Sequence, residues 1–443
     1  MRVLVLVDGE HYPPVTRWGI EVARSRGHEV IAALFLGGAE KVDPGRLPDL
    51  GLPTLPAGSD ITKALADAID QVGPEAVLDL SDEPVVGYRE RMELAAVSLV
   101  RGIPYLGPDF RLDPPISGPP LAVPTVAVIG TGKRTGKTAI GGEVARVAAG
   151  MGLNPILVAM GRGGPPEPQV ARAGTVTLDG LLDLVRKGEH AASDYLEDAV
   201  TSGVTTVGAR RAGGGLAGAP FASNVREAAG LAVDLGAGLV VLEGSGSAVP
   251  PIPWDAGILA VPVSAPPEYL GGYLGPYRLL LTDLVVFTMW GSPKAGPENL
   301  LALTSHVQRI RGDARLVVTD FQPVPLGDVR GKEAFFTTTA SQAVAAKQVA
   351  SLEAGFGCKV VGWSARLADR SGLMEDLEKA EAYEVLLTEL KAAAVDVACE
   401  RAMARGAEVV FVDNRPVAID GGTDLPTLLA ETMNLAVKRR EAR

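Results

Sequence analysis

The chain has 443 residues, 47% of them hydrophobic, and its 53 acidic side chains outnumber 42 basic ones to give a net charge of −11. Nucleic acids and anionic membrane surfaces attract basic proteins, so this charge excludes a general binder of either. Two widely separated cysteines and four histidines argue against a disulfide framework and a zinc site. No apolar run reaches the roughly 18 residues of a membrane span. We therefore expect a globular protein of the cytoplasm, with room for two or three domains at roughly 150 residues each.

The N-terminal part of the chain alternates between short apolar runs and amphipathic stretches. Strands are predicted at "VLVLV", "VIAALFL" and "AVLDLS", with helices around residues 17–26, 60–72 and 89–101. This rhythm is typical of a parallel α/β sheet. The passage from Tyr105 to Pro124 is rich in proline, which disfavours both helix and central strand, so a linker is expected there. We predict a smaller, Rossmann-like N-terminal α/β domain at residues 1–120.

The same alternation resumes after the linker. Strands are predicted at "TVAVIG", "NPILVAMG", "GLVVLEG", "GILAVPV", "DLVVFTM", "ARLVVTD", "CKVVGWS" and "AEVVFVDN". Residues 373–405 mix acidic and basic side chains and predict a pair of helices. We therefore expect residues 121–443 to form one large α/β domain with a mainly parallel sheet.

The stretch "GTGKRTGKTA" follows the first strand of this large domain and opens a helix. A glycine-rich turn in this place lets backbone N–H groups and the helix N-terminus face a phosphate. Lys137 is expected to reach the β- and γ-phosphates, and the Thr138 hydroxyl to ligate magnesium. The predicted nucleotide-binding residues are Gly130, Thr131, Gly132, Lys133, Thr135, Gly136, Lys137, Thr138 and Ala139. Gly130 lies one position further from Gly136 than in the usual phosphate loop, and this longer loop resembles that of dethiobiotin-synthetase-like ATPases. The alternative is a surface turn rich in glycine and lysine.

A carboxylate ends another predicted strand of this domain, in "GLVVLEGSGS". Glu243 stands just beyond the apolar run, where an acid can hold the magnesium of a bound nucleotide. An acid at a strand end also serves as a helix cap or lies in a solvated turn. Together with the phosphate loop, the position favours Thr138 and Glu243 as the metal site.

Two further glycine-rich segments contain arginine, and neither residues 151–166 nor residues 203–221 contain an acid. Arg162 lies in "MGRGGPPEP", while Arg210 and Arg211 precede Gly214 and Gly215 in "GARRAGGGLAGAPF". In an acidic protein such segments make local positive pockets, and arginine binds phosphate with two parallel hydrogen bonds. The alternative is a pair of mobile loops with solubilising charges. With Lys133, Arg134 and Lys137 the domain offers more positive charge than one ATP needs, so we expect a strongly anionic second substrate. We assign the catalytic residues as Lys137, Lys133, Arg134 and Arg211, and the substrate-binding residues as His11, Arg89, Arg162, Arg210, Arg211, Gly214 and Gly215.

The N-terminal domain contributes two of these substrate-binding residues. His11 follows the first strand in "DGEHYPP", at the carboxyl end of a parallel sheet, where α/β domains bind ligands. A helix-capping role for Asp8 and His11 is an equal alternative. Arg89 begins a helix beside Arg91, only one of which can face inward, and an ion pair with Glu90 or Glu93 is its alternative.

The order of these segments resembles the cyclic 2,3-diphosphoglycerate synthetases. The resemblance rests on "DGEHYPPV", "DEPVVGYRERMELA", "GTGKRTGKTA", "ARRAGGGLAG", "LEGSGS", "VFTMW" and "DNRPV", and covers essentially the whole chain. It implies an ATP-dependent enzyme that closes 2,3-diphosphoglycerate into its cyclic pyrophosphate and releases ADP and phosphate, with magnesium required and potassium as an activator. A homodimer is also expected. Two alternatives stay open, namely a carboxylate-activating ligase of the dethiobiotin synthetase type and a dimeric ATPase switch.

Overall fold

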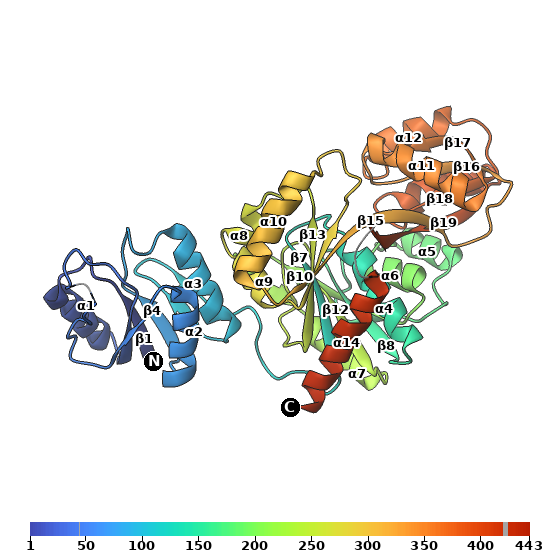
Figure 1. The fold of residues 1–443 in the computed structure, drawn as a ribbon. Helices are drawn as coiled ribbons and strands as arrows, with labels where there is room; N and C mark the ends of the chain where they lie inside the picture. The colour runs from blue at the N-terminus through green and yellow to red at the C-terminus, as the bar shows by residue number, and fades with distance from the viewer. Residues whose placement is uncertain (44, 420–423) are drawn as a thin grey trace.

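The computed structural model describes residues 1–43, 45–419 and 424–443. Figure 1 shows an N-terminal α/β unit beside a larger α/β unit, from which a small C-terminal lobe extends. The mainly parallel sheets confirm the predicted α/β fold class. Among the described helices none combines the length and the apolar character needed to cross a membrane.

The N-terminal unit is a six-stranded sheet with the order β3-β2-β1-β4-β5-β6. Its elements are β1 (Arg2–Val7), α1 (Pro13–Ser25), β2 (Glu29–Phe35), β3 (Thr54–Pro56), α2 (Ile61–Val72), β4 (Ala76–Asp79), α3 (Tyr88–Val100), β5 (Tyr105–Leu106) and β6 (Arg111–Leu112). All pairs are parallel except β5 with β6. Because the chain leaves β1 first toward β2 and later returns to β4, the switch point of the sheet lies between β1 and β4.

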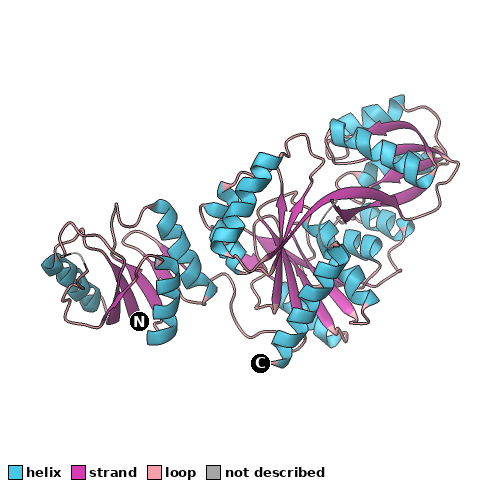
Figure 2. Cartoon of the chain, viewed as in Figure 1, coloured by secondary structure: helices cyan, strands magenta, loops and turns pink. Residues whose placement is uncertain are grey.

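The larger unit is built on one continuous sheet with the order β11-β10-β8-β12-β7-β13-β14-β15-β19-β18-β16-β17. Its strands are β7 (Thr125–Gly130), β8 (Pro155–Gly161), β9 (Gln169–Ala171), β10 (Thr206–Ala212), β11 (Ala222–Ser223), β12 (Leu239–Glu243), β13 (Ala256–Pro262), β14 (Leu284–Thr288), β15 (Arg315–Pro325), β16 (Glu333–Thr337), β17 (Lys359–Ser364), β18 (Val385–Thr388) and β19 (Glu408–Ala418). β7 lies between β12 and β13, with both pairs parallel. The antiparallel pair β15 and β19 carries the sheet into the C-terminal lobe (Figure 2).

Helices cover both faces of this sheet because the strands are apolar on both sides. The helices are α4 (Lys137–Gly150), α5 (Leu178–Arg186), α6 (Asp194–Ser202), α7 (Val225–Asp234), α8 (Glu268–Gly271), α9 (Gly275–Leu280), α10 (Pro297–Ile310), α11 (Gln342–Phe356), α12 (Arg370–Lys379), α13 (Glu400–Ala404) and α14 (Leu425–Glu441), with a π-helical turn at Ala394–Cys399. Side chains of α4, α5, α6 and α14 form the core on one face, and those of α7 to α10 form it on the other.

Five strands contradict the sequence-based assignment. Residues 373–405 are not a helical pair, because β18 runs through them and pairs with β16 and β19. β10 and β16 were also missed, so Arg210 and Arg211 stand at the end of a strand rather than within a loop. The linker predicted from Tyr105 also begins later in the structure, since β5 and β6 occupy its first residues. Residues 113–124 connect the two sheets, and the domain boundary at residue 120 stays a prediction.

The two units share an apolar contact. Helix α3 packs against α9, and Leu274 and Tyr277 of the larger unit are buried in the same core as Leu94 of α3. Beside this contact Glu93 of α3 forms an ion pair of 2.7 Å with Arg309 of α10. The N-terminal sheet is thus joined to the larger unit through one helix face.

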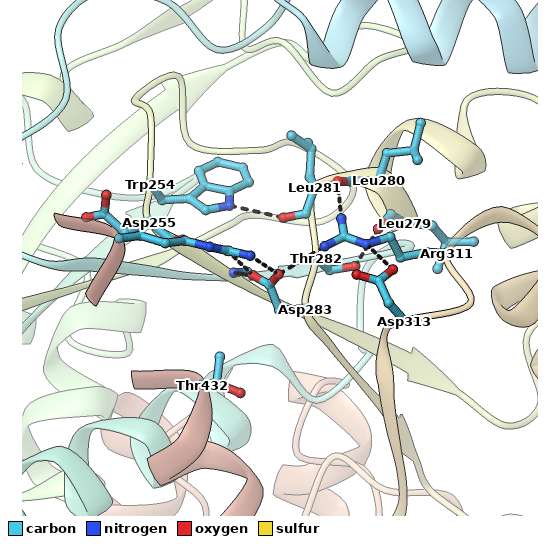
Figure 3. A network of polar contacts seen from close by, with 12 residues as sticks. Trp254, Asp255, Leu279, Leu280, Leu281, Thr282, Asp283, Arg311, Asp313 and Thr432 are labelled. Carbon is cyan, nitrogen blue, oxygen red and sulfur yellow. Dashed lines mark hydrogen bonds and ion pairs between the residues drawn. The ribbon is translucent and has the colours of Figure 1, made fainter. Parts of the chain in front are cut away.

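The C-terminal helix α14 is tied to the larger sheet by ion pairs. Arg439 donates to both carboxylate oxygens of Asp283 at 2.9 Å. Arg311 donates to the same carboxylate at 3.1 Å, a contact that Figure 3 shows. Arg440 pairs with Asp255, whose carboxylate also accepts from the backbone N–H of Thr125 at 3.0 Å. The start of β7 and the end of the chain are therefore held by one polar network.

Candidate active site

The phosphate loop joins β7 to α4. Gly136 has φ of +86°, a conformation that glycine adopts at little cost, and a Cβ there would lie 2.5 Å from the ring of Phe321 in β15. A Cβ on Gly130 would lie 2.4 Å from the hydroxyl of Thr135. Both glycines are needed for the tight turn, and the hydroxyl of Thr288 fixes it further by donating to the carbonyl of Thr135 at 2.9 Å.

Lys137 is folded back over this loop. Its ammonium group donates to the carbonyl of Gly132 at 2.8 Å and to the hydroxyl of Thr135 at 3.2 Å. The side chain is buried, and burial lowers the pKa of Lys137 to about 8, although the carboxylates of Glu243 and Asp194 oppose the change. The loop therefore holds a desolvated cation at the N-terminus of α4.

Glu243 ends β12, next to β7, and is 3% exposed. Burial, together with the charge of Asp194, raises the pKa of Glu243 to about 8, although Lys137 and the side chain of Thr138 oppose the change. Its Oε1 atom has no hydrogen-bond partner within the described residues. A buried carboxylate with an unpaired oxygen is costly, so this group fits a site whose missing partner is a cation.

The structure brings two of the predicted arginines together. A Cβ on Gly246 would lie 2.6 Å from Nη2 of Arg162 and 3.3 Å from Nη2 of Arg211, so both guanidinium groups lie over this glycine. Arg211 donates to the carbonyl of Ser245 at 2.8 Å, and burial lowers its pKa, with the charge of Arg162 acting in the same direction. Two cations held this close attract an anion with more than one charge.

Five other predicted residues of the larger unit lie on its surface. Lys133, Arg134 and Arg210 are exposed, and the backbone N–H of Arg210 is held by Asn224 at 2.7 Å. Gly214 and Gly215 lie in the exposed loop that follows β10. The charged side chains of Lys133, Arg134 and Arg210 are thus accessible to a ligand. The roles of all five residues stay predictions.

The two N-terminal residues make their polar contacts within their own unit, in the part of the chain that the structure describes. Nδ1 of His11 lies 2.9 Å from Asp8, which also accepts from the backbone N–H groups of His11 and Asp82. Arg89 pairs with Glu93 at 3.1 Å, whereas Arg91 points inward to Asp79 at 2.8 Å. The structure therefore does not bring His11 or Arg89 to the phosphate loop.

Sequence reasoning missed the carboxylates of helix α6. Asp198 is fully buried, neither of its oxygens has a partner among the described residues, and burial raises its pKa well above the usual value. Burial also raises the pKa of Glu197 to about 7, opposed by Lys391, whose ammonium group lies 3.0 Å away. The sequence did contain a signal for this cluster. Glu197 and Asp198 follow Asp194 by three and four residues and lie between the apolar Leu196 and Ala199, although charged residues seldom occupy the apolar face of a helix.

Comparison with known proteins gives matches along the whole chain. Family models described as the N-terminal, P-loop and C-terminal domains of cyclic 2,3-diphosphoglycerate synthetase match residues 2–113, 125–320 and 325–415. The chain belongs to this family. The synthetase of Rubrobacter xylanophilus is 48% identical over 95% of this chain and 96% of its own length. That of Methanothermobacter thermautotrophicus is 41% identical over 95% of this chain and 93% of its own.

Membership of the cyclic 2,3-diphosphoglycerate synthetase family confirms the resemblance seen in the sequence and makes the chain an enzyme. The matched P-loop domain is consistent with a reaction that uses ATP. Among solved structures, LpxK from Aquifex aeolicus in complex with ATP aligns over 73% of this chain and 90% of its own, with a TM-score of 0.42 and 14% identity.

Proposed function

We propose that this synthetase closes 2,3-diphosphoglycerate into cyclic 2,3-diphosphoglycerate at the expense of ATP. The observation that carries the proposal is the combination of a phosphate loop with a second cationic site, where Arg162 and Arg211 lie over Gly246. An ATPase that binds only its nucleotide has no need of the second site. The family membership of the whole chain supports the same substrate pair.

The phosphate loop is the proposed nucleotide site. Backbone N–H groups from Gly130 to Ala139 would surround the phosphates, and Lys137 would leave the carbonyl of Gly132 to contact the β- and γ-phosphates. Thr138 and Glu243 are the residues that would hold magnesium, and the unpaired Oε1 of Glu243 fits that role. The metal would supply positive charge to the transferred phosphoryl group. Lys133 and Arg134 are exposed on the loop and would add charge from its outer side.

The second cationic site is proposed for the diphosphoglycerate. Arg162 and Arg211 would each bind one phosphate, with Arg210 and the loop at Gly214 and Gly215 around them. Two phosphate groups on neighbouring carbons repel each other, so these residues must hold them together by neutralising their charge. The first step moves the γ-phosphoryl group of ATP to one phosphate oxygen and releases ADP. In the second step an oxygen of the other phosphate attacks the inner phosphorus, and the outer group leaves as inorganic phosphate.

The residues of the site accelerate both steps without a general base, because a phosphate nucleophile is already ionised at neutral pH. Lys137, Arg162 and Arg211 act by electrostatic stabilisation of charge on the transferred groups. Holding the two phosphates side by side makes ring closure unimolecular, and effective molarities for well-oriented reactions reach roughly 10⁵ M or more.

We further propose that the N-terminal domain, residues 1–120, keeps water away from the phosphorylated intermediate. His11 and Arg89 would approach the diphosphoglycerate when the domain moves over the site, and the joint between α3 and α9 is where that motion would be accommodated. Three finer proposals, activation by potassium, a homodimer and a cytoplasmic location, rest on the family resemblance and the composition. Turnover in potassium compared with sodium, and light scattering in solution, test the first two.

Phosphorus NMR tests the reaction directly. The protein is incubated with ATP, magnesium and 2,3-diphosphoglycerate, and we expect pyrophosphate resonances of a cyclic product together with ADP and inorganic phosphate. Neither 2-phosphoglycerate nor 3-phosphoglycerate should replace the substrate, because each lacks one of the two phosphates to be joined. The Lys137→Ala variant is the negative control. ATP hydrolysis without a cyclic product would support a switch ATPase instead, and activity on a carboxylate substrate would support the ligase alternative.

A further inference from the structure

Helix α6 presents a row of three carboxylates toward the interior of the larger unit. Glu197 and Asp198 follow Asp194 by three and four residues, which places all three carboxylates on one side of the helix. Glu197 is paired with Lys391 of the C-terminal lobe at 3.0 Å, and Asp198 is fully buried, where the charge of Glu243 helps burial to raise its pKa. Asp194 begins the helix and is less buried than Glu197 and Asp198.

Asp194 lies over the carboxyl end of strand β8. A Cβ placed on Gly161, the last residue of β8, would lie 3.4 Å from Oδ2 of Asp194. β8 pairs in parallel with β12, and Glu243 stands opposite Ala159, two residues before Gly161. Glu243 and Asp194 therefore face the same end of two adjacent strands. Because glycine has no side chain, the end of β8 leaves room for a carboxylate that comes from the helix.

The charges around Asp194 come from four separate segments. Lys391, Lys137, His190 and Arg162 all favour its ionised form, while burial raises its pKa. Its own charge in turn raises the pKa of Glu243. Within the described part of the chain no group donates a hydrogen bond to Asp194, although four basic side chains surround it. This carboxylate therefore lies within reach of the charges of the phosphate site and has no hydrogen-bond donor of its own among the described residues.

We propose that Asp194 is the second protein carboxylate facing the magnesium of the bound nucleotide, across from Glu243 and beside Thr138. This inference rests on the proposed ATP-dependent function. A second observation points to a ligand there, since Oε1 of Glu243 is buried and unpaired. The described His, Cys, Asp and Glu side chains form no ready cage for a metal ion by themselves. That agrees with magnesium, which is commonly bound through one or two carboxylates together with nucleotide phosphates and water.

A purely structural role for Asp194 is the alternative. An acid in the first turn of a helix interacts favourably with the helix dipole, and Asp194 stands in that turn. Asp179 occupies the first turn of α5 in the same way but is exposed to solvent. Asp179→Asn is therefore a matched control, because it removes a first-turn carboxylate away from the phosphate site.

The test measures metal and nucleotide binding by the full chain, without turnover. Binding of Mn²⁺ to the complex with a non-hydrolysable ATP analogue is followed by electron paramagnetic resonance, and binding of the analogue in EDTA is followed by calorimetry. We expect Asp194→Asn to lower the affinity for Mn²⁺ about 10- to 100-fold. Metal-free nucleotide should bind as well as before or more tightly, because a negative charge beside the phosphates is gone. Asp179→Asn should change neither affinity, and Asp194→Glu should restore part of the Mn²⁺ affinity.

Three outcomes would overturn the inference. Unchanged Mn²⁺ affinity in Asp194→Asn would show that the carboxylate does not face the metal. An equal loss of affinity for the metal-free and the metal-bound nucleotide would show that Asp194 only supports the fold of the site. A lower thermal unfolding temperature of the same sample would report this structural role directly. If the unaltered protein bound the analogue with no dependence on Mn²⁺, both this inference and the proposed metal-dependent function would fail, whereas the first two outcomes leave the function in place.

Discussion

Replacing Glu243 with glutamine should make the protein more stable and less active at the same time. The carboxyl group is buried beside Asp194, and its pKa is raised from 4.5 to about 8. Between these values the folded state holds a proton that the unfolded state releases, so stability falls as the pH rises from about 4.5 to about 8. Glutamine removes this titration while it keeps nearly the same shape. The free energy of unfolding of the variant should therefore exceed that of the wild type most near pH 8, and the two should be equal near pH 4.5.

The size of this gain follows from the same two pKa values. At about 1.4 kcal/mol per pKa unit, the ionisable side chain costs up to roughly 4 kcal/mol at pH 7.5. Part of this gain in stability is offset. The charge of Glu243 raises the pKa of Lys137, so burial of the lysine ammonium group costs more once the carboxylate is gone. We expect a net gain in the free energy of unfolding of about 2 kcal/mol at pH 7.5, and about zero at pH 4.5.

Urea denaturation at pH 4.5 and pH 7.5 measures the stability, and phosphorus NMR measures formation of the cyclic product. Turnover should fall by at least about 100-fold, since the carboxylate proposed to hold the magnesium is lost and with it the positive charge on the transferred phosphoryl group. The control is Glu227→Gln on the exposed first turn of α7, which should change neither property. If Glu243→Gln were less stable than the wild type at pH 7.5, or if its gain were equal at both pH values, the account of Glu243 as a buried, functionally retained carboxyl group would be wrong.

Four further predictions concern other parts of the molecule. Lys137→Ala should reduce turnover by about 100-fold or more without lowering the thermal unfolding temperature, and unchanged turnover would discard the phosphate-loop assignment. Arg211→Ala should weaken the binding of diphosphoglycerate by roughly 1.5–3 kcal/mol in calorimetry and leave ATP binding nearly unaffected. Arg211→Lys should restore only part of that binding, because an ammonium group lacks the planar fork of the guanidinium group. Equal losses of affinity for both substrates would assign Arg211 to the nucleotide site instead. Asp283→Ala removes the carboxylate partner of Arg439 and should lower the free energy of unfolding by about 2–3 kcal/mol, with faster hydrogen exchange in α14. Unchanged exchange would show that the Asp283 pair does not hold the helix. His11→Ala should raise the ratio of free phosphate to cyclic product if the N-terminal domain shields the intermediate, and an unchanged ratio would argue against that role.

The local sequence was sufficient for the parts of the molecule that depend on neighbouring residues. The phosphate loop lies within one continuous stretch, so the residue pattern alone places Gly130, Gly136 and Lys137 between a strand and a helix. The apolar runs of β7, β8 and β12 were likewise visible, because strands buried on both faces are apolar throughout. The position of Glu243 at a strand end followed from the same pattern.

The tertiary structure decided what depends on residues far apart in the chain. β18 lies in a stretch whose composition favours helix, and only its pairing with β16 and β19 makes it a strand. Likewise, the convergence of Arg162 with Arg211, and of Asp194 with Glu243, depends on the order β10-β8-β12-β7 in the sheet. Sequence periodicity shows which face of a segment is buried, but it does not tell which segment lies next to it. The residues that surround the phosphate loop were therefore fixed by strand order, a property of the folded chain as a whole.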